Sequence, residues 1–164
     1  MLKYALSACA ALVMLSHGGG IAFAQDSEPQ DWSVQCNRTN CIVVAEARLQ
    51  NGALFHQIRF EKVDSDLYAG IMKLPLGIHI PSGVQIGIDD DALIEAKIVT
   101  CTSEGCEAVF NANETVVNFF KRGRQMSVAL TNNSDRKKLA VNYSLMGFTK
   151  NWEEFRKRMN VLLP

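Results

Sequence analysis

The chain has 164 residues and a mass of 18.2 kDa, which is enough for one domain of ordinary size and too little for two. Hydrophobic residues make up 48% of the chain and charged residues 21%, a composition that excludes a disordered tail and a coiled coil. Lysine plus arginine and aspartate plus glutamate both number 17, and this balance argues against a nucleic-acid-binding protein held by bulk charge.

The N-terminal residues 1–24 have the three parts of a secretory signal peptide. Lys3 supplies a positive charge, residues 4–15 form an apolar run, and the run ends before an Ala-Phe-Ala cleavage pattern. The run is too short to span the ~30 Å hydrocarbon core of a bilayer. We predict cleavage near Ala24 and export to the periplasm or outer envelope. The exported protein then has a flexible leader at residues 25–31 and a single domain over residues 32–164.

A cysteine inside this signal imitates a lipoprotein cleavage site, because Cys9 follows the sequence Leu-Ser-Ala. In a lipoprotein signal the apolar run precedes the cysteine, whereas here it continues for six residues beyond Cys9. We therefore expect Cys9 to be removed with the signal peptide and not to carry a lipid.

The four remaining cysteines form two copies of one spacing, in which four residues rich in Asn, Thr, Ser and Gly separate each pair. These residue types favour tight turns, and strand-like sequence flanks both pairs. A hairpin with so short a loop brings the flanking Cβ atoms to within ~5 Å, which is disulfide range. We therefore predict two local disulfides, formed in an oxidising compartment. The predicted pairs are Cys36 with Cys41 and Cys101 with Cys106.

A zinc site and a redox-active dithiol are the competing interpretations of these cysteines. Both usually have two residues between the paired cysteines, whereas the gaps here hold four. We predict that the cysteines are structural and that the chain binds no metal.

Short segments from Trp32 onward alternate between apolar and polar residues with a period of two, and turn signals separate them. This pattern predicts an all-β domain of about seven to nine antiparallel strands, folded as a β-sandwich or, alternatively, as a barrel-like sheet. The segments are residues 32–35, 42–44, 54–61, 68–74, 84–88, 96–100, 108–110, 126–130 and 139–145.

Two stretches depart from this alternation and predict helices. The first, residues 113–122, begins at Asn113, a good N-cap residue, and ends before Gly123. The second opens at Thr149 with acidic residues early and basic residues late, as an amphipathic helix against the sheet requires. Its apolar stripe consists of Trp152, Phe155 and Met159.

Neither histidine of the domain has the surroundings of a catalytic base. His56 lies on the apolar face of its predicted strand, which favours a hydrogen-bonded core histidine over a general base. His79 lies between two isoleucines and faces away from them, which predicts an exposed strand residue. The chain has no nucleophile elbow, His-Glu-x-x-His motif or glycine-rich phosphate loop, so we predict no catalytic residue and no cofactor.

Three consecutive carboxylates, Asp89, Asp90 and Asp91, form the one acidic cluster. Calcium loops need a defined spacing and a glycine at the bend, and neither is present, so we predict a solvated hairpin turn. A cation site stays an alternative, as does an envelope enzyme with a cleft around Asp89–Asp91 or His56.

Charge is distributed unevenly along the chain. Residues 25–120 hold 6 basic and 14 acidic side chains, whereas residues 121–164 hold 10 basic and 3 acidic ones. Two interpretations stay open. The cations are solvated and paired with the acidic half, or the fold brings them together as a possible positive patch that contacts an anionic membrane surface, an anionic envelope polymer or an acidic partner protein. The patch residues are Lys121, Arg122, Arg124, Arg136, Lys137, Lys138, Arg156, Lys157 and Arg158.

A set of short motifs, in this order and with the double cysteine spacing, resembles the invasion-associated locus B family over roughly residues 32–155. One departure is that residues 96–100 precede Cys101 where the family pattern has a proline-aromatic step. The motifs are Trp32-x-Val34-x-Cys36, Leu74-Pro75-Leu76-Gly77, Pro81-Ser82-Gly83-Val84-x-Ile86, Cys101 with Gly105-Cys106, and Gly147-Phe148.

The resemblance implies an exported bacterial protein with an all-β core, in a family tied to host-cell invasion and without established catalytic residues. We therefore expect a binding or interaction protein, with a role in virulence or envelope integrity, whose partner is a protein or another envelope component. An assembly factor that docks on membranes through the basic C-terminal region is the second expectation.

Overall fold

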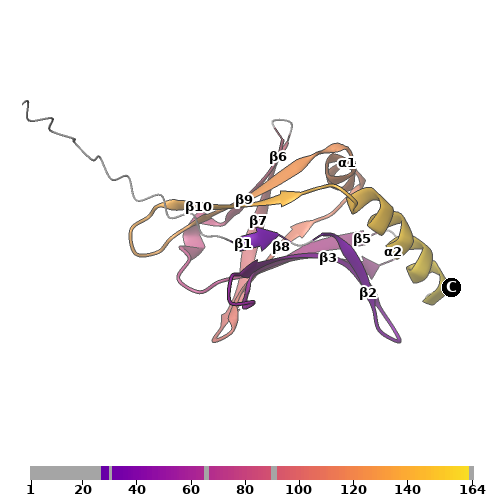
Figure 1. Cartoon of the computed structure of the whole chain (residues 1–164), viewed down its shortest axis with the longest axis horizontal. Coiled ribbons are helices and arrows are strands. Elements are labelled where there is room, and N and C mark those ends of the chain that lie inside the picture. The colour runs from indigo at the N-terminus through magenta and orange to yellow at the C-terminus, as the bar shows by residue number, and fades with distance from the viewer. Residues whose placement is uncertain (1–26, 30, 65–66, 90–91, 163–164) are drawn as a thin grey trace, which may run out of the picture.

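The alternating segments form one antiparallel sheet in a computed structural model that describes residues 27–29, 31–64, 67–89 and 92–162 (Figure 1). The predicted signal peptide and Cys9 lie outside the described residues. The strand order is β1-β3-β4-β5-β8-β7-β6-β9-β10, and β2 pairs with β3. The strands are β1 (Ser27–Pro29), β2 (Ser33–Cys36), β3 (Cys41–Leu49), β4 (Leu54–Asp64), β5 (Leu67–Leu74), β6 (Val84–Ile88), β7 (Ala92–Thr102), β8 (Gly105–Asn111), β9 (Gln125–Thr131) and β10 (Lys138–Ser144).

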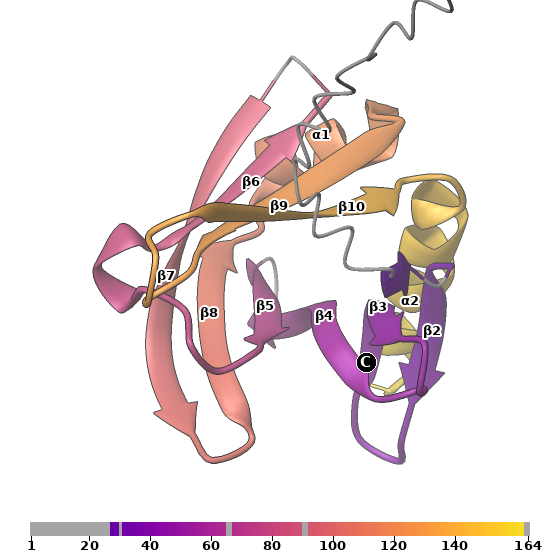
Figure 2. The same ribbon diagram turned by 60° about the vertical axis from the view of Figure 1, so that its left-hand side comes forward.

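The sheet curls into a half-barrel because β7 belongs to both of its halves (Figure 2). Residues 92–96 of β7 pair with β6, whereas the strand from Lys97 onward pairs with β8. The register with β8 shifts between Ile98 and Thr100, and an irregularity of this kind bends a strand and increases its twist. The all-β class is confirmed, and the sheet has the barrel-like form that the sequence allowed beside a β-sandwich.

The N-terminal edge of the sheet includes part of the segment predicted as a leader. Ser27–Pro29 pair with residues 47–49 of β3, so this stretch adds a short strand to the sheet. Both β1 and β2 therefore pair with β3, β1 near its end and β2 near its start.

Both predicted helices are present and cover the concave side of the sheet at one end (Figure 1). In α1 (Glu114–Arg122) the Asn113 side chain accepts a hydrogen bond from the Val116 N–H, 3.0 Å away, as predicted for an N-cap. The next helix, α2 (Phe148–Leu162), begins one residue before the predicted Thr149. It buries the predicted stripe together with Phe148.

An aromatic cluster joins these helices to the sheet. Phe60 of β4 lies at its centre, with ring-centroid distances of 5.0 Å to Phe120 of α1 and 5.3 Å to Phe148 of α2. The indole N–H of Trp32 donates to the Ser144 carbonyl, 2.9 Å away, and so links the start of β2 to the end of β10. The core is therefore continuous from the first strands of the chain to its last helix.

Gly70 is a position at which the core requires the absence of a side chain. The Phe110 ring, on the facing residue of β8, lies so close over Gly70 that an added Cβ would overlap it. We expect Gly70→Ala to lower the free energy of unfolding by about 1–3 kcal/mol, as overpacking does elsewhere. Urea denaturation measures this effect.

Gly87 of β6 is the matched control for this substitution. It also lies inside a strand, but no atom lies within 4 Å of an added Cβ, so we expect Gly87→Ala to change stability by less than about 0.5 kcal/mol. Equal losses in the two variants would contradict the packing explanation.

Candidate functional site

His56 is held inside the half-barrel, in contact with a residue from the far end of the sheet order. It lies on β4 and is fully buried, and its Nδ1 forms a hydrogen bond with the hydroxyl of Tyr143 on β10. Nε2 has no hydrogen-bond partner among the described residues. The prediction of a hydrogen-bonded core histidine is confirmed.

Burial also sets the protonation of this pair. It lowers the pKa of His56 from 6.5 to about 3, since a charged imidazole would lose its hydration there. Burial, and then the charge of Glu46, raise the pKa of Tyr143 above its ordinary value. Both groups are therefore neutral at pH 7, and neither is exposed where a substrate could reach it.

His79 does not lie in a strand, contrary to the sequence expectation. It precedes a 3-10 turn, Ile80–Ser82, and is half-buried. Its Nδ1 lies 2.7 Å from the Ser82 hydroxyl. Pro81 at the start of the turn has no N–H for a ladder, which explains why alternation ends here.

Asp89 has a structural task at the end of β6. Its carboxylate accepts hydrogen bonds from the backbone N–H groups of Arg124, at 2.9 Å, and Gln125, at 3.0 Å. The bond from Arg124 is the main reason that the pKa of Asp89 lies below its usual value. Asp89 lies in the predicted turn, whereas Asp90 and Asp91 lie outside the described residues. The described residues contain no group of three or more side chains that could hold a metal ion.

Both predicted cysteine pairs are joined in the structure. Cys36 faces Cys41 across β2 and β3, and Cys101 faces Cys106 across β7 and β8. The sulfur atoms lie 2.05 Å apart in the first pair and 2.04 Å apart in the second. Each disulfide therefore closes the end of one hairpin.

The structure divides the nine predicted patch cations into two groups. Arg124 precedes β9 and Arg136 follows it, so the seven-residue strand holds them roughly 20 Å apart. One group lies on and beside the helices, where Lys121 pairs with Glu153 at 2.5 Å. The helix group comprises Lys121, Arg122, Arg124, Arg156, Lys157 and Arg158, and the turn group comprises Arg136, Lys137 and Lys138.

A groove of about 280 Å³ lies between α2 and the disulfide-closed hairpin of β2 and β3; we call it the hairpin–helix groove. Met159 Sδ accepts a hydrogen bond from the Cys41 N–H, 3.2 Å away, and seats the helix on the hairpin. The last turn of α2 then leaves Val161 76% exposed. The lining residues are Cys36, Asn37, Cys41, Glu154, Lys157, Arg158, Val161 and Leu162.

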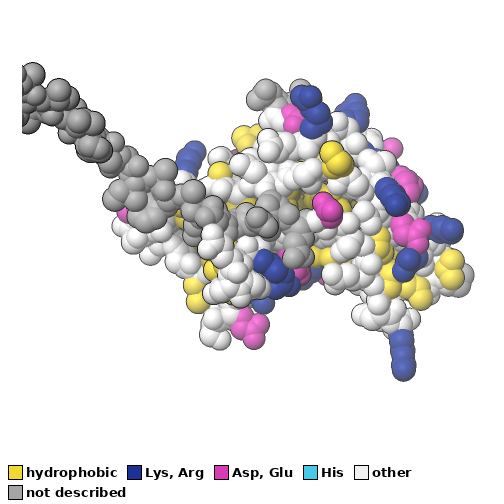
Figure 3. Space-filling model, viewed as in Figure 1, with side chains coloured by type: hydrophobic (Ala, Val, Ile, Leu, Met, Phe, Trp, Pro, Cys, Tyr) yellow, Lys and Arg dark blue, Asp and Glu magenta, His cyan; other side chains and the backbone are white. Residues whose placement is uncertain are grey.

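The groove combines apolar and basic side chains. Figure 3 shows hydrophobic side chains between Lys and Arg side chains at the end of the molecule where α2 meets the hairpin. Arg158 pairs with Glu154 at 2.7 Å, whereas Lys157 forms no ion pair with a described residue. Such a groove suits a partner that presents a carboxylate beside an apolar side chain.

Sequence reasoning identified Lys157 and Arg158 but missed the apolar part of this groove. The available signal was Val161, an apolar residue near the end of the helix that does not belong to the buried stripe of Trp152, Phe155 and Met159. Nothing local to residues 36–41 indicated that a helix would lie beside them.

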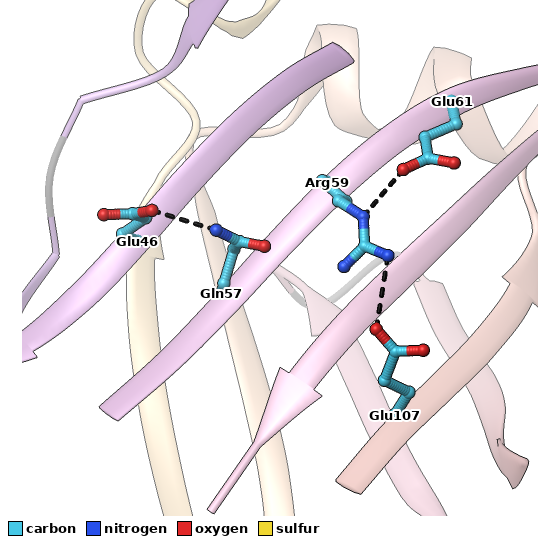
Figure 4. A network of polar contacts seen from close by, with 5 residues as sticks. All are labelled: Glu46, Gln57, Arg59, Glu61 and Glu107. Carbon is cyan, nitrogen blue, oxygen red and sulfur yellow. Dashed lines mark hydrogen bonds and ion pairs between the residues drawn. The ribbon is translucent and has the colours of Figure 1, made fainter. Parts of the chain in front are cut away.

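A polar network on the outer face of the sheet was also missed (Figure 4). Arg59 of β4 contacts Glu61 at 2.7 Å and Glu107 of β8 at 3.3 Å. Beside it, Gln57 donates to Glu46 of β3 at 2.9 Å. These side chains are engaged with one another within and between strands, so the network is a weaker candidate for binding than the groove.

No helix of the described residues is long and apolar enough to cross a membrane.

Known proteins resemble this chain over most of its length. Residues 24–156 match the family model of the Invasion associated locus B (IalB) protein. Invasion protein B homologs from Brucella abortus strain 2308 and biovar 1 strain 9-941 are each 29% identical over 135 residues, covering 79% of this chain and 78% of theirs. The crystal structure of invasion associated protein b from Bartonella henselae has a TM-score of 0.70 at 18% identity, covering 82% of this chain and 99% of that one, and so shares the fold.

Proposed function

The chain belongs to the invasion associated locus B family, and we propose that it is an exported periplasmic or outer-envelope protein that acts by binding a partner and catalyses no reaction. Two features support export. The family match begins at residue 24, where the predicted signal peptide ends, and disulfides persist in oxidising compartments outside the cytosol. A contribution to host-cell invasion or envelope integrity is part of the proposal, because the relatives are named for invasion.

The hairpin–helix groove is the observation that carries the binding proposal. It places the exposed Val161 one helical turn from Lys157 on α2, facing the disulfide-closed hairpin, and the buried face of α2 holds the helix on the core. Its volume lies just below the range of small-molecule pockets, which suits a few side chains of a protein partner better than a large cofactor.

Two of the residues that the sequence offered for catalysis, His56 and Asp89, support binding over chemistry, whereas Asp90 and Asp91 lie outside the described residues. His56 is buried with Tyr143, and the carboxylate of Asp89 is engaged by two backbone N–H groups. A catalytic base must reach the proton that it removes, which His56 cannot do because it is fully buried, and the Asp89 carboxylate already accepts two backbone hydrogen bonds. Turnover by the purified protein that one polar substitution abolishes would contradict this part of the proposal.

Photo-crosslinking in intact cells tests the groove. A photoreactive amino acid at Val161 is expected to capture a discrete partner, whereas the same amino acid at Val99, a 61% exposed valine on β7, is expected to capture none. Lys157→Glu is expected to weaken the Val161 crosslink by about tenfold or more, because it replaces attraction to a carboxylate with repulsion. Equal labelling from both positions, or a crosslink indifferent to Lys157→Glu, would reject the groove as the site.

A further inference from the structure

The end of the molecule away from α2 carries a second surface, built from two loops that are remote in sequence. Residues 76–82, which include the 3-10 turn, lie beside residues 132–138, which comprise the connection from β9 to β10 and the first residue of β10 (Figures 1 and 2). The His79 N–H donates to the Thr131 carbonyl at 2.7 Å, and the Asn133 N–H donates to the Gly77 carbonyl at 2.8 Å. We call the joined loops, residues 76–82 and 132–138, the loop tip.

The loop tip exposes apolar side chains beside cations. Leu76 is 56% exposed and Ile80 is 52% exposed, although backbone hydrogen bonds fix the loops that carry them. The turn group of cations, which is fully part of the loop tip, is also exposed. Lys137 lies 3.7 Å from Asp135, and neither Arg136 nor Lys138 forms an ion pair with a described residue. The surface therefore has a net positive charge around two protruding apolar groups.

We propose that the loop tip docks the protein on an anionic phospholipid bilayer. Leu76 and Ile80 enter the boundary between headgroups and acyl chains, while Arg136, Lys137 and Lys138 contact lipid phosphates. Aliphatic side chains flanked by lysine and arginine are the combination that gives interfacial membrane binding.

A lipid surface fits the loop tip better than a protein partner does. Neither loop contains a Trp, Tyr or Phe residue, the aromatic types enriched in protein–protein interfaces, and Arg136 is the one loop-tip residue of a type that such interfaces favour. A bilayer needs no such anchor, because it accepts aliphatic side chains at any position and offers many phosphates to the cations. Docking through this end leaves the hairpin–helix groove, at the other end of the molecule, open to a partner.

Vesicle sedimentation with the purified exported protein tests the proposal. We expect binding to phosphatidylglycerol/phosphatidylcholine vesicles and much weaker binding to phosphatidylcholine alone. Arg136→Gln combined with Lys138→Gln is expected to weaken binding about 25-fold, or about fivefold for each cation removed. The matched control, Lys150→Gln with Arg156→Gln on α2, removes two exposed cations that lie outside the hairpin–helix groove, and it is expected to change binding less than about twofold.

The apolar contribution has a separate variant. Leu76→Ser with Ile80→Ser is expected to weaken binding about tenfold or more and to remove the part that resists high salt, because those two side chains then no longer enter the bilayer. Circular dichroism checks that the variants fold.

Three results would overturn the proposal: binding indifferent to lipid charge, loss of binding in the α2 variant alone, or full binding by the serine variant. The last would indicate a surface for any polyanion. None of these three sedimentation results changes the expected Val161 crosslink, so the membrane proposal and the groove proposal are tested independently.

Discussion

Phe60→Ala is expected to lower the free energy of unfolding by about 3–5 kcal/mol, the largest effect of a single substitution that we predict. Phe60 is fully buried and its ring contacts five other aromatic rings from both sheet and helices. Removing the ring leaves a cavity where β4, α1 and α2 meet, and the close-packed rings around it relax only partly into that space. The contacting rings are those of Trp32, Phe110, Phe120, Phe148 and Trp152.

Tryptophan fluorescence during urea denaturation measures this loss directly. The ring centroids of Trp32 and Trp152 lie 6.0 Å and 5.7 Å from that of Phe60, so the fluorescence of both residues reports on the aromatic cluster. Phe119→Ala is the matched control, because Phe119 is only half-buried on α1, and we expect it to cost less than about 1.5 kcal/mol. A Phe60 variant no less stable than the Phe119 variant would show that the cluster does not hold the helices on the sheet.

The elements of this fold were predictable because they follow from local patterns. Alternation marks a strand that is buried on one face, and the stripe of α2 marks a helix that packs on a sheet. The curl of the sheet was not predictable, since it depends on an irregularity of β7 between Ile98 and Thr100 that no residue type announces. At Gly123 the predicted end of the first helix is correct, but the reason for glycine differs from the expected left-handed conformation. Its φ of −69° is not left-handed, and glycine is needed because a Cβ would lie 2.5 Å from Ile88.

The sequence indicated which residue types contribute to the candidate sites but not how the fold brings them together. The turn containing Asp89 follows from local sequence, but its bonds to Arg124 and Gln125 join residues 35 and 36 positions apart. The cations of the C-terminal part were recognised, yet β9 separates them into two groups whose positions depend on strand pairing. The hairpin–helix groove needs the contact of Cys41 with Met159, which are 118 positions apart. Surfaces made by such long-range contacts leave little trace in the local sequence.

The stability of the protein is expected to fall as pH drops from 6.5 toward 3, by about 1.4 kcal/mol per pH unit, because of His56. In the unfolded chain the His56 imidazole is protonated as pH falls through 6.5, whereas in the folded protein it is protonated only near pH 3. The contribution of His56 to the free energy of unfolding is therefore complete above pH 6.5 and decreases progressively below it. Acidic groups with lowered pKa, Asp89 and Glu154, add their own loss only below their ordinary values of 3.8 and 4.5. The window from pH 6.5 to 4.5 thus reports on His56, with an expected loss of about 2–3 kcal/mol.

Replacing both members of the buried pair isolates this effect. His56→Phe combined with Tyr143→Phe removes both buried titrating groups that the described residues place inside the half-barrel, and two apolar rings occupy their place. We expect stability within about 1 kcal/mol of the wild type at pH 7.5, since both hydrogen-bonding partners leave together, and a flat profile between pH 6.5 and 4.5. Tyr143→Phe alone leaves both His56 nitrogens unpartnered, so it is expected to cost about 1–3 kcal/mol and to keep the slope. Urea midpoints measured at each pH distinguish these cases. Parallel profiles for the wild type and the double variant would mean that His56 is hydrated in the folded protein, and its exclusion from catalysis would then lose its physical basis.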